Sequence, residues 1–334
     1  MKIVAFFHMK EVRWNLADED CRRLEARFPG VHLVAIEDPA DLSREIVDAD
    51  VFVGFTIPRD VFVAARQLRW VQSISAGIEE NLYPEMLASS VVLTGGTGLH
   101  AVCIPEHVLG QMFVLARNFH EAQRLQAACE WNRFQCIIFG PSIIELQGSN
   151  LAIFGAGAIG QGLAQRAAAL GMHVRVLRRH ATRPLPGVEA VVPPERLQEL
   201  LSWADFVVLA LPLTRETHGL VGERQLAAMK SSAHLINVGR GELIDEEALV
   251  SALQRGAIGG AALDVFNQEP LPSEHPFWKL PNLVLTPHIS GYTPNYFRKA
   301  LDLFEDNLGR YIAATPLRNV VDKRLGYAPP SDAK

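Results

Sequence analysis

Cysteine is scarce in this 334-residue chain, and no two cysteines have the Cys-x-x-Cys spacing of a redox or zinc motif. Cys129 and Cys136 are close enough in the sequence to form a redox or metal pair, but no second pair of ligands accompanies them. We therefore expect reduced thiols and no metal site, as in a cytoplasmic protein. The four cysteines are Cys21, Cys103, Cys129 and Cys136.

Long runs of one residue class are also missing. No apolar segment approaches the roughly 20 residues that cross a membrane, and the apolar run after Lys2 is too short for a secretory signal. No long basic run stands out, and the formal net charge is -5. These absences argue against a membrane or nucleic-acid partner and favour a cytoplasmic location.

What the chain does contain is a regular alternation of short apolar runs with amphipathic stretches. Hydrophobic residues make up 49% of it, enough for two cores, because single cores stop growing at roughly 250–300 residues. Alternation of this kind predicts parallel sheets covered by helices on both faces. The expected strands are 2–7, 31–36, 51–55 and 68–74, then 151–154, 173–177, 206–212, 234–239, 259–265 and 283–288.

Two longer helical patterns indicate how these strands are divided. One runs from about Pro105 to about Ala128, and the other from about Pro294 to about Ala314. We predict an α/β fold with two Rossmann-like domains, in which a cofactor domain is inserted into a discontinuous, flavodoxin-like substrate domain. The predicted boundaries are residues 101–289 for the cofactor domain, and residues 1–100 with 290–334 for the substrate domain.

A glycine motif, Gly-x-Gly-x-x-Gly, follows the predicted strand 151–154 and precedes a helical pattern. Gly155 permits a tight turn, Gly157 lets a pyrophosphate approach the backbone, and Gly160 lets the helix pack closely on the strand. The amide groups at the start of the helix favour anions. The motif predicts a dinucleotide site, and the alternative is a glycine-rich turn without a ligand.

The residues after the next strand bear on the choice of dinucleotide. An NAD enzyme usually carries an acidic residue there, which bonds the ribose hydroxyls. This chain has Arg178 and Arg179, with His180 and Arg183 beyond. A guanidinium can hold a 2′-phosphate with two parallel hydrogen bonds, so we predict that NADP is preferred and that NAD use is secondary. The alternative is an ordinary solvated basic loop.

Three chemically suitable residues follow later strands, where the carboxyl ends of a parallel sheet meet a crevice. Arg240 can hold a carboxylate and polarise a carbonyl, and His288 can donate a proton near neutral pH. Glu269 can bond the imidazole and raise its pKa. Each residue alone would be interpreted as structural or as part of the surface. Their joint placement predicts reduction of a 2-keto acid.

Several further motifs carry a family resemblance over nearly the full length of the chain. They are AVCIPEHVLG (101–110), GAGAIG (155–160), PLTRETHGLVG (212–222), INVGRGELIDEEAL (236–249), GAALDVFNQEPLP (260–272) and TPHISG (286–291). Together they resemble the D-isomer-specific 2-hydroxyacid dehydrogenase family. The resemblance implies hydride transfer between NADPH and a small 2-keto acid, of the kind handled by glyoxylate/hydroxypyruvate reductases.

The resemblance also implies residue roles. Arg240 would bind the substrate, His288 would be the acid/base and Glu269 its partner. The loop of Ser75, Ala76 and Gly77 would bind the substrate carboxylate. The implied cofactor contacts, besides the glycines and arginines above, are Ala158, Ile159, Leu211, Pro212, Val238, Asp264 and Gly291. A homodimer formed largely through the cofactor domain is implied as well.

The chain departs from the family pattern in two places. Ala158 stands where many relatives carry arginine, which removes one phosphate contact. The segment after His288 contains Tyr292 and Tyr296, which either shape the substrate pocket or pack against a helix. We assign no role to Trp131, which follows the long predicted helix.

Other activities on the same fold differ in what they require. Formate dehydrogenases resemble this chain but carry glutamine where it has Glu269, which argues against formate. Phosphite dehydrogenase shares the arginine, glutamate and histidine, so the trio does not exclude phosphite. A cofactor-sensing corepressor, similar to the C-terminal-binding proteins, would bind peptides without turnover. Nothing in the sequence selects one 2-keto acid.

Overall fold

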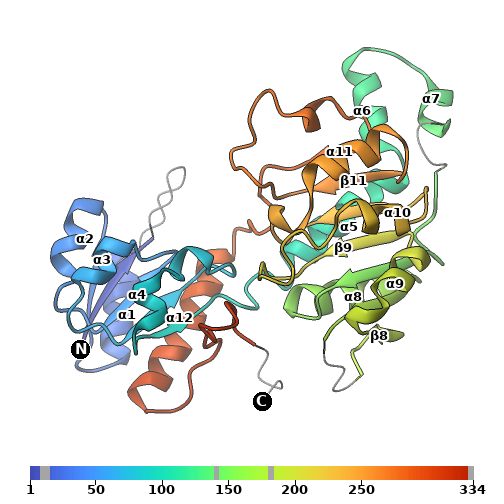
Figure 1. The fold of residues 1–334 in the computed structure, drawn as a ribbon. Coiled ribbons are helices and arrows are strands. Elements are labelled where there is room, and N and C mark those ends of the chain that lie inside the picture. Colours follow the sequence, from blue (N-terminus) through green and yellow to red (C-terminus); the bar gives the residue numbers. More distant parts are fainter. Residues whose placement is uncertain (8–15, 139–142, 180–183, 330–334) are drawn as a thin grey trace. The chain divides into compact units, whose positions relative to one another are not determined.

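The computed structural model describes residues 1–7, 16–138, 143–179 and 184–329, and it forms two compact units (Figure 1). Unit 1 contains Met1–Leu99 and Thr293–Lys334, and unit 2 contains His100–Tyr292. Among the described residues, no helix is both long enough and apolar enough to span a membrane.

Unit 1 is built on a five-stranded parallel sheet with the strand order β2-β1-β3-β4-β5. Its strands are β1 (Lys2–Phe6), β2 (His32–Ile36), β3 (Val51–Gly54), β4 (Trp70–Ser73) and β5 (Val92–Thr94). Its helices are α1 (Asp18–Arg27), α2 (Pro39–Glu45), α3 (Arg59–Ala64), η1 (Glu79–Asn81), α4 (Pro84–Ala88) and α12 (Tyr296–Ile312). This is the flavodoxin-like strand order.

Successive side chains of these strands pack alternately into two separate cores, one on each face of the sheet, because strands are pleated. Ile3 and Ala5 of β1 point to the face covered by α1 and α12, where Phe304 is fully buried. Val4 and Phe6 point to the opposite face, covered by α2, α3 and α4. Both faces are therefore apolar, as expected for a parallel sheet.

Unit 2 is built on a seven-stranded parallel sheet with the strand order β12-β11-β10-β9-β6-β7-β8. Its strands are β6 (Asn150–Phe154), β7 (His173–Leu177), β8 (Ala190–Val192), β9 (Phe206–Leu209), β10 (His234–Asn237), β11 (Gly260–Leu263) and β12 (Leu283–Leu285). The order reverses between β6 and β9, and ligands of such sheets bind beyond the carboxyl ends of the strands at that point.

Helices cover both faces of this second sheet. α5 and α8 pack on one face, and α9, α10 and α11 pack on the other. The helices of unit 2 are α5 (Cys103–Ala116), α6 (Phe119–Ala127), α7 (Arg133–Ile138), α8 (Ala158–Ala169), η2 (Pro194–Arg196), α9 (Leu197–Trp203), α10 (Glu223–Ala228), η3 (Gly241–Leu243), α11 (Glu246–Gln254) and η4 (Pro276–Lys279).

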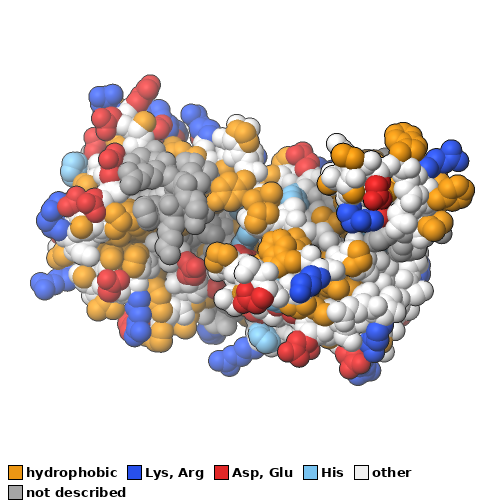
Figure 2. All heavy atoms as spheres, turned by 90° about the horizontal axis from the view of Figure 1, so that it is seen from above, with side chains coloured by type: hydrophobic (Ala, Val, Ile, Leu, Met, Phe, Trp, Pro, Cys, Tyr) orange, Lys and Arg blue, Asp and Glu red, His pale blue; other side chains and the backbone are white. Residues whose placement is uncertain are grey.

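An apolar surface lies on unit 2 where α6 and α7 project from the sheet. Trp131 between these helices is 97% exposed, and Phe134 and Ile138 of α7 are 73% and 69% exposed. Figure 2 shows hydrophobic side chains gathered over this part of unit 2. Three large apolar side chains in this part of unit 2 are therefore exposed to solvent.

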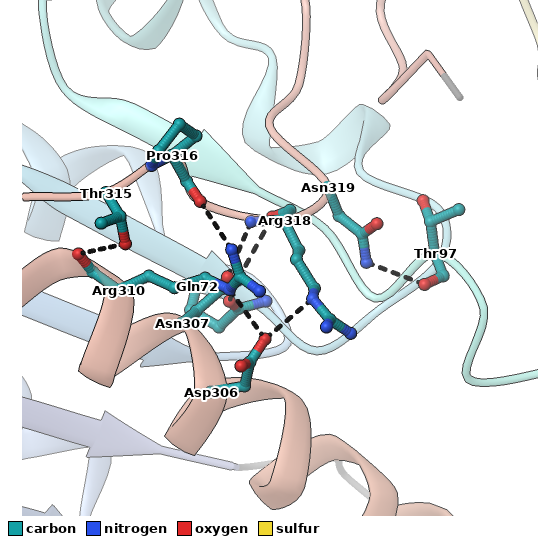
Figure 3. Close-up of polar contacts among 9 residues, drawn as sticks. All are labelled: Gln72, Thr97, Asp306, Asn307, Arg310, Thr315, Pro316, Arg318 and Asn319. Atoms are coloured by element: carbon teal, nitrogen blue, oxygen red, sulfur yellow. Dashed lines mark hydrogen bonds and ion pairs between the residues drawn. The ribbon is translucent and has the colours of Figure 1, made fainter. Parts of the chain in front are cut away.

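The C-terminal segment returns to unit 1 and is held there by hydrogen bonds of side-chain amides (Figure 3). The side-chain amide of Asn307 on α12 donates to Gln72 Oε1 at 2.8 Å, and the amide N–H of Arg318 donates to Asn307 Oδ1 at 2.8 Å. Asn319 donates from Nδ2 to the carbonyl oxygen of Thr97 at 2.8 Å. These bonds connect α12 and the residues after it to the strand ends of unit 1.

The predicted α/β fold with two Rossmann-like units is confirmed, with two differences in detail. Two three-residue strands, β5 and β8, were not expected, because such short runs carry little alternation. The single helix expected from Pro105 to Ala128 is wrong, because the chain breaks at Asn118 into α5 and α6. Asn118 has φ +53°, a conformation that asparagine tolerates better than most residues, and its side chain bonds the carbonyl oxygen of Cys136.

Candidate active site

The glycine motif forms a tight turn between β6 and α8, at the reversal of strand order. Gly155 has φ +110°, and a side chain there would lie 2.5 Å from the carbonyl oxygen of Ala210. A Cβ at Gly160 would overlap the carbonyl oxygen of Gly155. A Cβ at Gly157, in contrast, would meet no protein atom within 4 Å. The turn is therefore closed on its inner side and open at Gly157.

This geometry fits the phosphates of a dinucleotide. α8 begins at Ala158 and continues for twelve residues, so the N–H groups of its first turn have no partner within the helix. They include those of Ala158, Ile159 and Gly160, beside the open space at Gly157. The N-terminus of such a helix favours a negatively charged group. Leu211 and Pro212, which follow β9, lie on the Ala210 side of this turn.

Arg178 and Arg179 follow β7, the strand beside β6. The backbone N–H of Arg178 donates to the carbonyl oxygen of Val192 at 3.0 Å, which fixes the backbone at this position. Arg179 forms an ion pair with Glu216 at 3.5 Å, and both side chains are exposed. His180 and Arg183 lie outside the described residues. The charge of Arg179 is therefore partly neutralised by Glu216.

Arg240 lies in a loop that a buried asparagine organises after β10. Asn237 Oδ1 accepts from the N–H of Gly239 at 3.0 Å, and its Nδ2 donates to the carbonyl oxygen of Arg240 at 2.7 Å. Arg240 Nη1 donates to the carbonyl oxygen of Gly239 at 2.7 Å. We did not single out Asn237 from the sequence, although an amide ending the apolar run His234–Asn237 was a usable signal.

Glu269 and His288 form a short ion pair beyond β11 and β12. Glu269 Oε2 lies 2.7 Å from His288 Nδ1, and Glu269 Oε1 accepts from the N–H of Phe266 at 2.9 Å. The hydrogen bond with Glu269 raises the pKa of His288 above its ordinary value of 6.5, against the opposing effect of burial. Burial would raise the pKa of Glu269, but its bonds with His288 and Phe266 outweigh this and lower it. The His288 side chain is 50% exposed, so its other nitrogen can reach a ligand.

The turn that carries His288 is fastened to Asp264, the residue after β11. Asp264 is fully buried, and its carboxylate accepts from the N–H groups of Ile289 and Ser290, each at 3.0 Å. The carbonyl oxygen of Asp264 also accepts from the N–H of His288 at 2.9 Å. His288 has φ +51°, which costs a non-glycine residue about 1–3 kcal/mol unless its surroundings hold it.

The structure brings Arg240, Glu269 and His288 together at the carboxyl ends of neighbouring strands. β10, β11 and β12 are adjacent in the sheet. Gly241 packs so tightly on the backbone of Phe266 and Asn267 that a side chain there would overlap it. The charge of Arg240 adds to the lowering of the Glu269 pKa and partly opposes the rise of the His288 pKa, and it is the smallest cause in both cases.

The predicted substrate loop belongs to unit 1, where it follows β4. The carbonyl oxygen of Ser75 accepts from the N–H of Gly96 at 2.7 Å, and that of Ile74 accepts from the hydroxyl of Tyr296 at 2.6 Å. Tyr296 is buried and stacks on Phe55, with ring centroids 6.3 Å apart. Tyr296 therefore packs in the core of unit 1 and also holds the backbone that leads into Ser75, Ala76 and Gly77.

Comparison with known proteins gives relatives that agree with one another in family and in named activity. The family model described as D-isomer specific 2-hydroxyacid dehydrogenase, NAD binding domain, matches residues 109–290. The glyoxylate reductase of Thermofilum pendens is 34% identical over 276 residues, which are 80% of each chain. The glyoxylate/hydroxypyruvate reductase B of Pectobacterium carotovorum is 35% identical over 283 residues, covering 84% of this chain and 87% of that one.

A solved structure agrees over almost the whole chain. It is the NADPH-dependent glyoxylate/hydroxypyruvate reductase of Sinorhizobium meliloti, in complex with NADP and sulfate. Its TM-score is 0.81 at 28% identity, with 98% of this chain and 99% of that chain covered. Because the family model spans more than half of the chain and the relatives exceed 30% identity, the chain belongs to the D-isomer-specific 2-hydroxyacid dehydrogenase family of NAD(P)-dependent oxidoreductases.

Proposed function

We propose that this dehydrogenase reduces a small 2-keto acid with NADPH, using Arg240 to bind the substrate and His288 to protonate it. The observation that carries this proposal is the 2.7 Å pair of His288 and Glu269, placed at the strand ends beside the Arg240 loop. A charged imidazole next to a guanidinium suits a substrate that carries a carboxylate and receives a proton on oxygen.

The pair determines which nitrogen of His288 acts. Because Nδ1 faces Glu269, Nε2 is the nitrogen left to donate a proton to the carbonyl oxygen. Glu269 keeps the ring oriented and stabilises its charged form, and its lowered pKa keeps it ionised. Arg240 holds the carboxylate and polarises the carbonyl with its planar fork. The nicotinamide, when bound, supplies the hydride, and in the opposite direction His288 accepts the proton.

The residues that would hold the dinucleotide lie at the same edge of the unit 2 sheet. Gly155, Gly157 and Gly160 would admit the pyrophosphate, with N–H groups from the start of α8. We assign Leu211 and Pro212 to the adenosine end, and Val238, Asp264 and Gly291 to the nicotinamide end. Asp264 Oδ1 already accepts from Thr286 and Ile289, so it would reach a ligand only through Oδ2.

We further infer that NADPH is preferred over NADH. Two guanidinium groups, Arg178 and Arg179, follow β7 where a ribose-binding acid would otherwise stand. Arg179 is paired with Glu216, so Arg178 would contribute more of the 2′-phosphate binding. The related reductase from Sinorhizobium meliloti was solved with NADP, which supports this choice.

For the substrate we propose glyoxylate or hydroxypyruvate, since two of the relatives are named for these acids. The loop of Ser75, Ala76 and Gly77 would contact the substrate carboxylate through its backbone. Tyr296 and Gly96 donate hydrogen bonds to the carbonyl groups of Ile74 and Ser75, and these bonds fix the backbone of the loop.

We also propose a cytoplasmic homodimer formed through unit 2. The exposed apolar side chains of Trp131, Phe134 and Ile138 give a surface suited to a second copy of the chain. None of the four cysteines forms a disulfide, which is compatible with a reducing compartment.

A substrate panel tests the proposed reaction. Oxidation of NADPH and NADH would be followed with glyoxylate, hydroxypyruvate and larger 2-keto acids, and reduction of NADP and NAD with phosphite as the control donor. We expect the highest kcat/KM for glyoxylate or hydroxypyruvate with NADPH. Binding of the dinucleotide without turnover of any keto acid would overturn the proposal.

A further inference from the structure

A partly buried polar cluster next to the His288 turn has no part in the mechanism above. It is formed by His107 and Gln111 of α5 and by Thr286, the residue after β12. His107 Nε2 lies 3.1 Å from Thr286 Oγ1, and Gln111 Nε2 donates to the same oxygen at 3.3 Å. Thr286 Oγ1 in turn donates to Asp264 Oδ1 at 2.6 Å.

His107 and Gln111 are four residues apart, so they lie on the same face of α5. Gln111 is buried, and among the described residues its Oε1 has no hydrogen-bond partner. Buried polar atoms are seldom left unpaired. Among the described residues, the one hydrogen bond of this side-chain amide is the donation to Thr286.

The direction of each hydrogen bond follows from the number of protons available. A threonine hydroxyl has one proton to donate and two lone pairs to accept with. Its proton is directed to Asp264 Oδ1, the shortest of its three contacts at 2.6 Å. Both lone pairs of Thr286 Oγ1 are then filled by Gln111 and His107, so His107 must carry a proton on Nε2.

Asp264 transmits this arrangement to the catalytic histidine. Its two carboxylate oxygens accept from Thr286, Ile289 and Ser290, which lie on both sides of His288. His288 itself holds an unfavourable backbone conformation, with φ +51°. Small movements of the turn would therefore change the distance between His288 and Glu269.

We propose that His107 is a positioning residue for His288, acting from α5 through Thr286 and Asp264. The proposal rests on the proposed function, in which His288 is the proton donor. His107 touches neither the substrate nor the reacting atoms in this scheme. Its role is to donate to Thr286, so that the hydroxyl of Thr286 keeps donating its hydrogen bond to Asp264 and the turn keeps its shape.

The variants that test this are His107→Phe, which removes the donor at similar size, and His107→Gln, whose side-chain amide restores an N–H. The matched control is His120→Phe, since the His120 ring on α6 faces the carbonyl oxygen of Val114 at 3.3 Å. We expect kcat to fall roughly tenfold in His107→Phe. This is smaller than the roughly 10²–10⁴-fold rate enhancement that a general acid/base supplies, because His288 itself is still present. His107→Gln should recover most of it, and His120→Phe should lose little.

A purely structural role is excluded by a second readout, the pKa of the His288 ring from NMR of the cofactor-free protein. The charged groups that act on this ring are Glu269, Asp264 and Arg240. If the turn relaxes, the bond with Glu269 weakens, and the pKa of His288 should be lower in His107→Phe than in the parent. It should return towards the parent value in His107→Gln.

The same spectra report the tautomer of His107 directly, and they do not require turnover. We expect the proton on Nε2. A neutral His107 protonated on Nδ1 would overturn the proposal, and so would a folded His107→Phe variant with parent kcat and an unchanged His288 pKa. If the parent protein turns over no keto acid, the proposed function fails, whereas the tautomer and the His288 pKa still decide the positioning role.

Discussion

Some functional residues at the strand ends of unit 2 can be predicted from sequence motifs, whereas others can be identified only from their contacts in the structure. Arg240, Glu269 and His288 were predicted from the sequence, because each follows a strand with a residue type suited to the chemistry. Asn237 and His107 were not, because a polar residue inside an apolar strand or helix looks the same whether it is structural or functional. Only the contacts with Gly239 and Thr286 distinguish them.

The His288–Glu269 pair gives a prediction about pH. Reduction requires the protonated ring, so the rate holds at low pH and falls as pH rises through the raised pKa of His288. Glu269→Gln removes the main cause of that increase, so the fall should move to lower pH. The measurement is kcat/KM for keto acid reduction against pH. The exposed Glu274→Gln is the control, and an unmoved profile in Glu269→Gln would contradict the assigned pairing.

Arg178 gives a prediction about the cofactor. Arg178→Asp replaces a phosphate donor by a repelling charge, and hydrogen bonds to charged groups contribute about 1.5–3 kcal/mol. The Kd of NADPH should rise by roughly ten- to a hundredfold, whereas that of NADH changes little. Titration of both dinucleotides measures this, with Arg196→Gln, an exposed arginine paired with Glu199, as control. A parallel loss of both affinities would argue against a 2′-phosphate contact.

At the scale of elements, most helices and strands follow from the alternation of apolar and polar residues. The exceptions have local causes. β5 and β8 are too short for a period to show. The break between α5 and α6 depends on the bond from Asn118 to the carbonyl oxygen of Cys136, a contact with another element that no local pattern contains.

The β6–α8 turn yields a paired prediction. In Gly160→Ala, the new methyl group would overlap the carbonyl oxygen of Gly155, so stability should fall by about 1–3 kcal/mol. In Gly157→Ala, the methyl group meets no protein atom within 4 Å, so stability should be nearly unchanged. Dinucleotide affinity should fall in both. Thermal unfolding and dinucleotide titration separate the two effects, and full affinity in Gly157→Ala would place the pyrophosphate elsewhere.

At the scale of the whole molecule, the sequence predicted that a second domain interrupts the first, because the glycine motif and six apolar runs lie between the two outer segments. It did not predict how the C-terminal segment is held in unit 1. That attachment depends on Asn307, which bonds the backbone of Arg318 eleven residues later and the side chain of Gln72, which is 235 residues away in the sequence.

The exposed apolar surface of unit 2 predicts a dimer, and charged residues introduced into that surface should disrupt it. Phe134→Asp combined with Ile138→Asp should convert the protein to a monomer in sedimentation, because both side chains lie on α7 within that surface. Val63→Asp, at an exposed apolar residue of unit 1, should leave the dimer intact. A monomeric parent protein would refute the proposed assembly.

The most direct test of the proposed active site is the kinetics of Arg240→Ala, with NADPH binding measured in parallel. The account predicts that kcat/KM for the 2-keto acid falls by at least about a hundredfold, as when a preorganised donor to a developing charge is removed. The Kd of NADPH should stay close to that of the parent. Substantial turnover by the variant would contradict the assignment of Arg240, and with it the site built around His288 and Glu269.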